Sequence, residues 1–263
     1  MHHNMTNTPA ATPARRQLTI VIPAYCEQDR LALTTNEVIT AANETLDDYE
    51  VIIVNDGSTD NTRAVADALA AQHSCIKVIH FDVNQGVGAA YRAGLASANF
   101  DNISLVPGDQ AFETSGVLDV FAAVGQADMI ISYRANPRAR SPVRRLLSRI
   151  CTMQLRVTTR CLLRDGHSMY VWPVKLARSI DIPPDYSYHL VTLVSLLQKV
   201  STYAELPVTL TPKPDEFSRV LQLNTVATLA WRLSLLTLAS FARLGAPAPR
   251  RVELTPRVSR AKT

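Results

Sequence analysis

The sequence lacks the features of small disulfide-stabilised or secreted proteins. Its four cysteines, Cys26, Cys75, Cys151 and Cys161, form neither a Cys-x-x-Cys pair nor a cysteine–histidine spacing typical of metal sites. A chain of 263 residues, 47% of them hydrophobic, can bury a core without disulfides, so we expect reduced thiols and a cytoplasmic protein. Residues 1–14 lack the apolar run of a signal peptide, and we expect residues 1–16 to be a disordered leader.

A long uncharged apolar segment is also lacking. Residues 226–244 are apolar overall, but Arg232 interrupts them and leaves only residues 233–242 uncharged. A membrane-spanning helix needs about twenty predominantly apolar residues, so this segment is too short to span. We predict an amphipathic or apolar helix over residues 221–245, packed in part on the domain and in part at an interface. Residues 246–263 are predicted to be a basic tail with nothing to pack against.

Acidic residues are absent from a long arginine-rich stretch. Residues 134–164 contain nine arginines and no aspartate or glutamate. The spacing predicts a helix over residues 142–164, with the arginines at 145, 149, 156, 160 and 164 on one face. That face can be merely solvated, or it can bind nucleic acid, anionic lipid or a phosphorylated substrate. No aromatic residues are interleaved with the arginines and no nucleic-acid-binding motif is visible, so we do not expect nucleic acid as a partner.

The chain does contain two apolar segments of strand length near its start. The first begins at residue 18 and runs into Pro23-Ala24-Tyr25-Cys26-Glu27, and the second, residues 51–54, is followed by Asn55-Asp56-Gly57-Ser58. Residues 28–49 lie between them and have room for one helix, which makes a βαβ unit. Ligands of parallel sheets bind at the carboxyl ends of the strands, where Glu27 and Asp56 stand. The second motif by itself could also be only a turn that caps the next helix.

Strands and helices continue to alternate after this unit. Strands are predicted over residues 76–81, 103–106, 129–133 and 203–210, and helices over residues 87–98, 117–124 and 186–200. This alternation is typical of an α/β protein with a mostly parallel sheet flanked by helices. We therefore predict one α/β domain over residues 17–220.

The two motifs at this spacing resemble the nucleotide-binding half of glycosyltransferase family 2. That family usually has Pro-x-Tyr/Phe-Asn-Glu where this chain has Pro23 to Glu27, and Cys26 replaces the asparagine. The resemblance implies the GT-A fold, which is Rossmann-like, and a nucleoside-diphosphate sugar as the donor. It also implies a set of nucleotide-binding residues: Pro23, Ala24, Tyr25, Glu27, Asp56, Ser58 and Gly86.

A third segment carries the diphosphate end of the resemblance. The family holds a divalent metal on an Asp-x-Asp motif after the fourth strand, where this chain reads Pro107-Gly108-Asp109. Only the second aspartate is retained, so Asp109 is the expected metal ligand and a catalytic residue. One or two carboxylates together with substrate phosphates can hold Mg²⁺. We expect Mg²⁺ or Mn²⁺ on Asp109, the alternative being that the segment is only a turn.

Residues 84–92 contain a Gly-x-Gly pattern that is weak evidence for a dinucleotide. It follows the third predicted strand rather than the first, and Tyr91 occupies the position where that fingerprint has Gly or Ala. The segment resembles instead the Asn-x-Gly-x-Gly-x-Ala loop of the same glycosyltransferase family. In that interpretation, the loop covers the donor and opens a helix whose N-terminus favours anions.

The second half resembles the polyprenyl-phosphate sugar transferases of this family more loosely. The matching pieces imply a phosphate- or acceptor-binding set, namely Arg134, Arg144, Ser148, Lys213 and Arg219. A phosphate acceptor is already ionised near neutral pH and needs no general base, whereas a hydroxyl acceptor needs one. Asp165 is the expected catalytic base for the second case, with His167 and His189 as weaker candidates.

Together these observations predict an inverting glycosyltransferase, with inversion implied by the family alone. The expected acceptor is a polyprenyl phosphate, and the expected location is the cytoplasm, peripheral on the inner face of a membrane with anionic lipid. The alternative is a nucleotide-sugar-binding pseudoenzyme or regulatory protein, since Pro107 has replaced one metal ligand.

Overall fold

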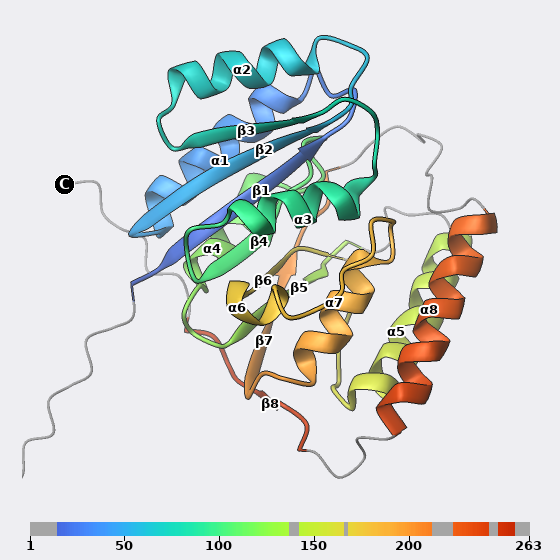
Figure 1. Ribbon diagram of the computed structural model, residues 1–263. Coiled ribbons are helices and arrows are strands. Elements are labelled where there is room, and N and C mark those ends of the chain that lie inside the picture. The colour runs from blue at the N-terminus through green and yellow to red at the C-terminus, as the bar shows by residue number, and fades with distance from the viewer. Residues whose placement is uncertain (1–14, 137–141, 166–167, 212–222, 242–246, 256–263) are drawn as a thin grey trace, which may run out of the picture.

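The structure is a computed structural model that describes residues 15–136, 142–165, 168–211, 223–241 and 247–255. The predicted leader up to residue 14, His167, Lys213 and Arg219 lie outside the described residues. The described strands form one sheet in the order β3–β2–β1–β4–β6–β5–β7–β8 (Figure 1). Their bounds are β1 Gln17–Ala24, β2 Asp48–Asp56, β3 Ile76–Phe81, β4 Asn102–Leu105, β5 Met129–Arg134, β6 Tyr170–Pro173, β7 Thr202–Val208 and β8 Arg250–Arg251.

The first βαβ unit is formed as predicted. Helix α1 (Leu31–Thr45) connects β1 to β2, and the two strands pair in parallel from Gln17 opposite Asp48 to Ala24 opposite Asn55. This register places the carboxyl ends of both strands side by side. The two motifs that follow the strands are therefore neighbours in space, as parallel pairing requires.

Helices cover both faces of the sheet. The helices α1, α2 (Thr62–Gln72) and α4 (Thr114–Ala122) pack on one face, whereas α3 (Val87–Ser97) and α7 (Tyr188–Leu197) pack on the other. In β1 the even-numbered Leu18, Ile20 and Ile22 join the first core, while Val21 joins the second. A strand buried on both faces reads as a continuous apolar run, which is why β1 was recognisable in the sequence.

The predicted parallel alternation fails at one strand. β6 was not predicted, and it pairs antiparallel with both β4 and β5, whereas all other described strand pairs are parallel. The short helix α6 (Val174–Ala177) follows it directly. Burial explains why β6 forms, since Tyr170, Val171 and Trp172 are each at most 5% exposed. Its direction depends on where α5 returns the chain.

Two long helices lie side by side at the edge of the second face (Figure 1). They are α5 (Pro142–Thr159) and α8 (Leu223–Phe241), which contact each other and α7. α5 ends earlier than predicted because Arg160 adopts a left-handed backbone with a φ of 56°. None of the described helices is long and apolar enough to cross a membrane.

The prediction that the chain after residue 245 has nothing to pack against is wrong for residues 250–254. β8 pairs in parallel with β7, and Val252 and Leu254 pack against the first core. An ion pair of 3.3 Å joins Arg251 to Glu205 of β7. The apolar residues between the arginines account for this, because they find a partner only at the edge of the folded sheet.

Candidate functional site

Hydrogen bonds tie the first two motifs to each other. The backbone N–H of Cys26 donates to Ser58 Oγ at 3.0 Å, and that of Glu27 donates to Thr62 Oγ1 at 2.9 Å. Cys26 has a positive φ of 57°, which turns the chain sharply after β1. Ser58 was predicted to bind the nucleotide, but it is not among the residues that line the cavity described below. It instead fixes the loop that carries Tyr25 and Glu27.

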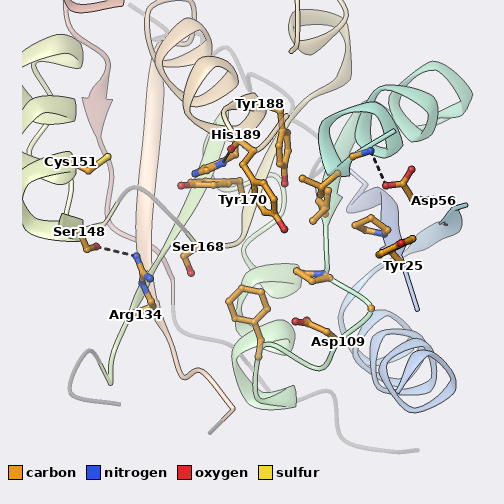
Figure 2. A pocket seen from close by; sticks show the side chains of 18 of the residues that line it. Tyr25, Asp56, Asp109, Arg134, Ser148, Cys151, Ser168, Tyr170, Tyr188 and His189 are labelled. Carbon is orange, nitrogen blue, oxygen red and sulfur yellow. Dashed lines mark hydrogen bonds between the residues drawn. The ribbon is translucent and has the colours of Figure 1, made fainter. Parts of the chain in front are cut away.

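Asp56 organises a third loop from the end of β2. Its two carboxylate oxygens accept hydrogen bonds from the backbone N–H groups of Gln85, at 2.7 Å, and Gly86, at 2.9 Å (Figure 2). Gly57 permits this contact. Its φ is +66°, and a Cβ atom there would lie 2.3 Å from the Val83 carbonyl carbon. Only glycine lets the two loops approach so closely.

The N-terminus of α3 differs from the prediction. The backbone N–H groups of Gly88 and Ala89 both donate to the carbonyl oxygen of Pro184, at 2.9 and 3.2 Å. These two helix-start donors are therefore not available to an anion, contrary to what the Gly-x-Gly loop suggested. A Cβ on Gly88 would lie 2.2 Å from the Pro183 carbonyl oxygen, so this glycine serves close packing of the Pro183–Pro184 segment.

The loop after β4 presents Asp109. The Gly108 N–H donates to the carbonyl oxygen of Pro23 at 3.1 Å, and Thr34 Oγ1 of α1 donates to the Gly108 carbonyl at 3.1 Å. Gln110 completes the turn with a φ of 55°. Gly108 is thus held by the end of β1 and by α1, and the next residue, Asp109, lies on the cavity wall (Figure 2).

The donor set at Asp109 fits a shared cation rather than one held by protein alone. No group of three or more His, Cys, Asp or Glu side chains that could hold a metal exists among the described residues. A single carboxylate can hold Mg²⁺ or Mn²⁺ when a diphosphate and water complete the shell. The retained aspartate therefore fits the expected cofactor in the presence of a nucleotide.

Arg134 and Asp165 form a buried pair opposite this loop. Their side chains are only 6% and 8% exposed. Arg134 Nε donates to Asp165 Oδ2, Nη2 donates to Oδ1 at 2.6 Å, and Nη2 also reaches Ser148 Oγ of α5 at 3.3 Å. Arg134 and Ser148 line the cavity, whereas Asp165 does not. The prediction that Asp165 is a general base conflicts with this position, because its carboxylate faces Arg134 instead of the open space.

The sequence analysis missed an aromatic wall that lines the same cavity as Asp109 and Arg134. Tyr170 and Trp172 of β6 stack with ring centroids 5.2 Å apart, and Tyr188 of α7 lies beside them. His189 Nδ1 is 2.9 Å from the carbonyl oxygen of Tyr186, which makes Nδ1 the donor. Burial lowers the pKa of His189 to about 4, so the imidazole is neutral at pH 7 and is a poor general acid there. The aromatic run at residues 170–172 was the only signal for this wall.

One cavity of about 620 Å³ connects the Asp109 loop, Arg134 and the aromatic wall. Nine of the predicted site residues line it: Pro23, Ala24, Tyr25, Glu27, Asp56, Gly86, Asp109, Arg134 and Ser148. Beyond Ser148 the wall becomes apolar, with Leu147 and Ile150 of α5 and Leu233 of α8. Arg144 lies in α5, but its side chain is outside the described part of the structure. The cavity is large enough for a sugar nucleotide and runs from the strand ends to the α5–α8 pair.

A family model matches residues 19–158, more than half of the chain, and its description is glycosyl transferase family 2. The chain belongs to glycosyl transferase family 2. The match includes both leading motifs, the Asp109 loop, Arg134 and most of α5. The family resemblance stated from the sequence is thereby confirmed.

Relatives and solved structures agree with this assignment. A dolichyl-phosphate beta-glucosyltransferase of Trichomonas vaginalis is 32% identical over 149 residues, which cover 52% of this chain and 46% of that protein. An undecaprenyl-phosphate mannosyltransferase of Micrococcus luteus is 32% identical over 125 residues, 46% of this chain and 49% of that protein. The chain thus spans about half the length of these relatives.

The fold is that of solved glycosyltransferases. Glucosyl-3-phosphoglycerate synthase of Mycobacterium tuberculosis, in complex with UDP, superposes with a TM-score of 0.65 at 17% identity, over 89% of this chain and 86% of that one. Its complex with Mn²⁺, UDP-glucose and phosphoglyceric acid gives a TM-score of 0.62 at 16% identity, over 87% and 80% of the two chains. The predicted GT-A fold of this family 2 protein is confirmed.

Proposed function

We propose that this chain is an inverting glycosyltransferase that moves a sugar from a nucleoside diphosphate to a polyprenyl phosphate. One observation carries the proposal: a single cavity has the nucleotide motifs and Asp109 at one end and Arg134, Ser148 and apolar helix residues at the other. A charged donor requires a polar end of the cavity. An acceptor with a phosphate head and a hydrocarbon chain requires a cation beside an apolar surface at the other end. Its relatives named for dolichyl and undecaprenyl phosphate support this acceptor class.

The donor end supplies binding groups for a nucleotide. Glu27 and Asp56 stand at the ends of adjacent strands, where carboxylates accept hydrogen bonds from ribose hydroxyls or a base edge. Asp56 already holds the loop at residues 84–86, so its role includes shaping the pocket as well as contacting the nucleotide. Pro23, Ala24, Tyr25 and Gly86 complete this wall.

In this proposal Asp109 meets the diphosphate of a nucleotide held by Glu27, since both side chains line the same cavity. A Mg²⁺ or Mn²⁺ ion on this carboxylate would neutralise the charge that the diphosphate gathers as the leaving group. Structures of the Mycobacterium tuberculosis enzyme contain Mn²⁺ with UDP-glucose, which supports the same kind of cofactor here. The loop that holds Asp109 is fixed in advance by Pro23 and Thr34, so little reorganisation is needed when the donor binds.

The acceptor end supplies cations for a phosphate. Arg134 is a planar donor suited to phosphate oxygens, and Ser148 adds a hydroxyl. Arg144, Lys213 and Arg219 are proposed for the same role from the sequence. A phosphate is ionised at neutral pH, so its oxygen can attack the anomeric carbon without a general base.

The outer faces of α5 and α8 fit contact with a membrane. Apolar side chains on these faces are exposed to between 45% and 67% of their surface; they are Leu146, Ile150, Met153 and Val157 of α5 and Trp231, Leu235 and Leu238 of α8. We call these seven side chains the α5–α8 surface. The exposed Arg149 and Arg156 flank it, as suits anionic lipid at the cytoplasmic face. An acceptor chain entering between the two helices would reach Ser148 directly.

A transfer assay tests the proposal. The full chain would be incubated with labelled nucleotide sugars and Mg²⁺ or Mn²⁺. The acceptor would be either farnesyl phosphate, which is a short polyprenyl phosphate, or 3-phosphoglycerate. We expect a metal-dependent product with farnesyl phosphate and none with 3-phosphoglycerate. Transfer only to 3-phosphoglycerate would replace the acceptor class. Tight binding of nucleotide without transfer or donor hydrolysis would instead support the pseudoenzyme alternative.

A further inference from the structure

We propose that Asp165 is a positioning residue that aims Arg134 at the phosphate of the acceptor. This inference rests on the proposed function and changes the role expected of Asp165. The sequence analysis named Asp165 as the general base that a hydroxyl acceptor would need. The structure instead turns its carboxylate away from the cavity and onto the guanidinium.

The hydrogen bonds divide the guanidinium into two parts. The Asp165 carboxylate accepts hydrogen bonds from Nε and Nη2, which is the side-on arrangement of an arginine–carboxylate pair. Ser148 Oγ lies 3.3 Å from the same Nη2. Among the described residues, no acceptor is bonded to Nη1. Because Arg134 lines the cavity, Nη1 is the part of its side chain that can serve a phosphate oxygen.

Burial makes this orientation rigid. Both side chains are less than one-tenth exposed, and an arginine removed from water at this depth requires a carboxylate partner. The backbone N–H of Arg134 also points to Asp165 Oδ2 at 3.4 Å, so the carboxylate contacts both ends of the residue. Without Asp165, the guanidinium could turn toward Ser148 or toward solvent in the cavity. Its charge would remain, but its hydrogen atoms would no longer face one point.

The pair also links β5 to α5 and to the segment that follows α5. Arg134 is the last residue of β5, Asp165 follows α5, and Ser148 lies within α5. The phosphate-binding group is thus attached to the helix that carries part of the α5–α8 surface. A correctly seated α5 is therefore needed for a correctly aimed Arg134, which links membrane contact to acceptor binding.

Binding of farnesyl phosphate to the full chain saturated with UDP tests the inference. Calorimetry would compare the wild type with Asp165→Asn, which keeps the shape but removes the charge. We expect farnesyl phosphate to bind about tenfold more weakly, since one charge-assisted hydrogen bond loses its direction. The dissociation constant of UDP should change by less than about twofold, because Asp165 is outside the donor end.

A matched control separates aiming from stability. Glu50 is a buried carboxylate that pairs with Lys77 at 2.8 Å, away from the cavity. Glu50→Gln should lower the free energy of unfolding and leave both dissociation constants unchanged. If Asp165→Asn behaves in the same way, the pair is purely structural and the inference is overturned. Should Asp165→Asn not fold, Asp165→Glu moves the carboxylate by one methylene and predicts a smaller loss of the same kind.

Turnover distinguishes positioning from base catalysis. Positioning predicts a higher KM for farnesyl phosphate, a nearly unchanged kcat and an unchanged pH profile in Asp165→Asn. A collapse of kcat at constant KM, with loss of the acidic limb, would make Asp165 a base after all. If the wild type neither binds nor uses farnesyl phosphate, the proposed acceptor fails, and inorganic phosphate becomes the probe. Weaker phosphate binding by Asp165→Asn would then still support the inference, and unchanged binding would overturn it.

Discussion

The two ends of the cavity are built in different ways. At the donor end, short loops after β1, β2, β3 and β4 are fixed by hydrogen bonds that involve backbone groups, such as the N–H groups of Gln85 and Gly86 that donate to the Asp56 carboxylate. At the acceptor end, Arg134 of β5 forms a buried pair with Asp165, which follows α5, and also contacts Ser148 of α5. In the proposed function, donor recognition therefore depends on backbone shape, whereas acceptor recognition depends on side-chain charge and on helix placement.

The comparison predicts its largest effect at Asp109, where the proposed donor end holds the diphosphate. Asp109→Ala should reduce transfer by about 100- to 1,000-fold. Asp109 is the retained aspartate of the Asp-x-Asp motif, and without it a cation at the diphosphate loses its carboxylate ligand. Affinity for the nucleoside should change little, since Glu27 and Asp56 remain. Steady-state kinetics and UDP binding would be measured on the same sample. A rate equal to that of the wild type would remove Asp109 from the mechanism.

Backbone shape at the donor end predicts the next effect. Gly57→Ala places a Cβ 2.3 Å from the Val83 carbonyl carbon at a φ of +66°, so the two loops must separate. We expect a loss of about 3 kcal/mol in the free energy of unfolding, with much weaker UDP binding. Urea unfolding would measure the former.

Gly125 provides the matched control. Its φ is +84°, but a Cβ there would meet no atom within 4 Å. Gly125→Ala should therefore cost only about 1 kcal/mol, which is the backbone term alone, and leave UDP binding intact. Equal losses for the two variants would show that the close approach of the loops is not what requires Gly57.

The buried His189 predicts a pH effect on stability. Its pKa is lowered to about 4 by burial, whereas the unfolded value is about 6.5. Between these pH values only the unfolded chain binds the proton. The contribution of neutral His189 to the free energy of unfolding is therefore full above about pH 6.5 and is lost as the pH falls toward 4. Over this range the free energy of unfolding should decrease by about 2 to 3 kcal/mol. Urea unfolding of His189→Gln should have a flatter profile over this range than the wild type, and equal profiles would contradict this assignment.

The smallest expected effect concerns the α5–α8 surface. Met153→Asp puts a charge on a side chain that is 67% exposed. We expect roughly tenfold weaker binding to vesicles with anionic lipid, since about one apolar contact is lost, and normal turnover on a soluble short acceptor. Leu33→Asp, at a 52% exposed position of α1, should leave vesicle binding unchanged. Equal effects of both variants in flotation assays would contradict a specific membrane face.

The sequence by itself determined the donor end. Parallel strands that are buried on both faces appear as apolar runs, and their carboxyl ends must meet, so Glu27, Asp56 and Asp109 could be placed together in advance. Gly57 was visible as a turn residue, but its contact with Val83 was not, because that contact joins loops from different strands.

Only the tertiary structure decided the acceptor end. The antiparallel β6, the neutral His189 and the pairing of Asp165 with Arg134 depend on where α5 returns the chain, which local residue patterns do not encode. The arginines of α5 were recognised as one face of a helix, but which of the remaining α5 side chains are buried and which exposed depends on the neighbouring α8. Periodicity fixes which side chains share a face, whereas long-range packing alone decides what that face meets.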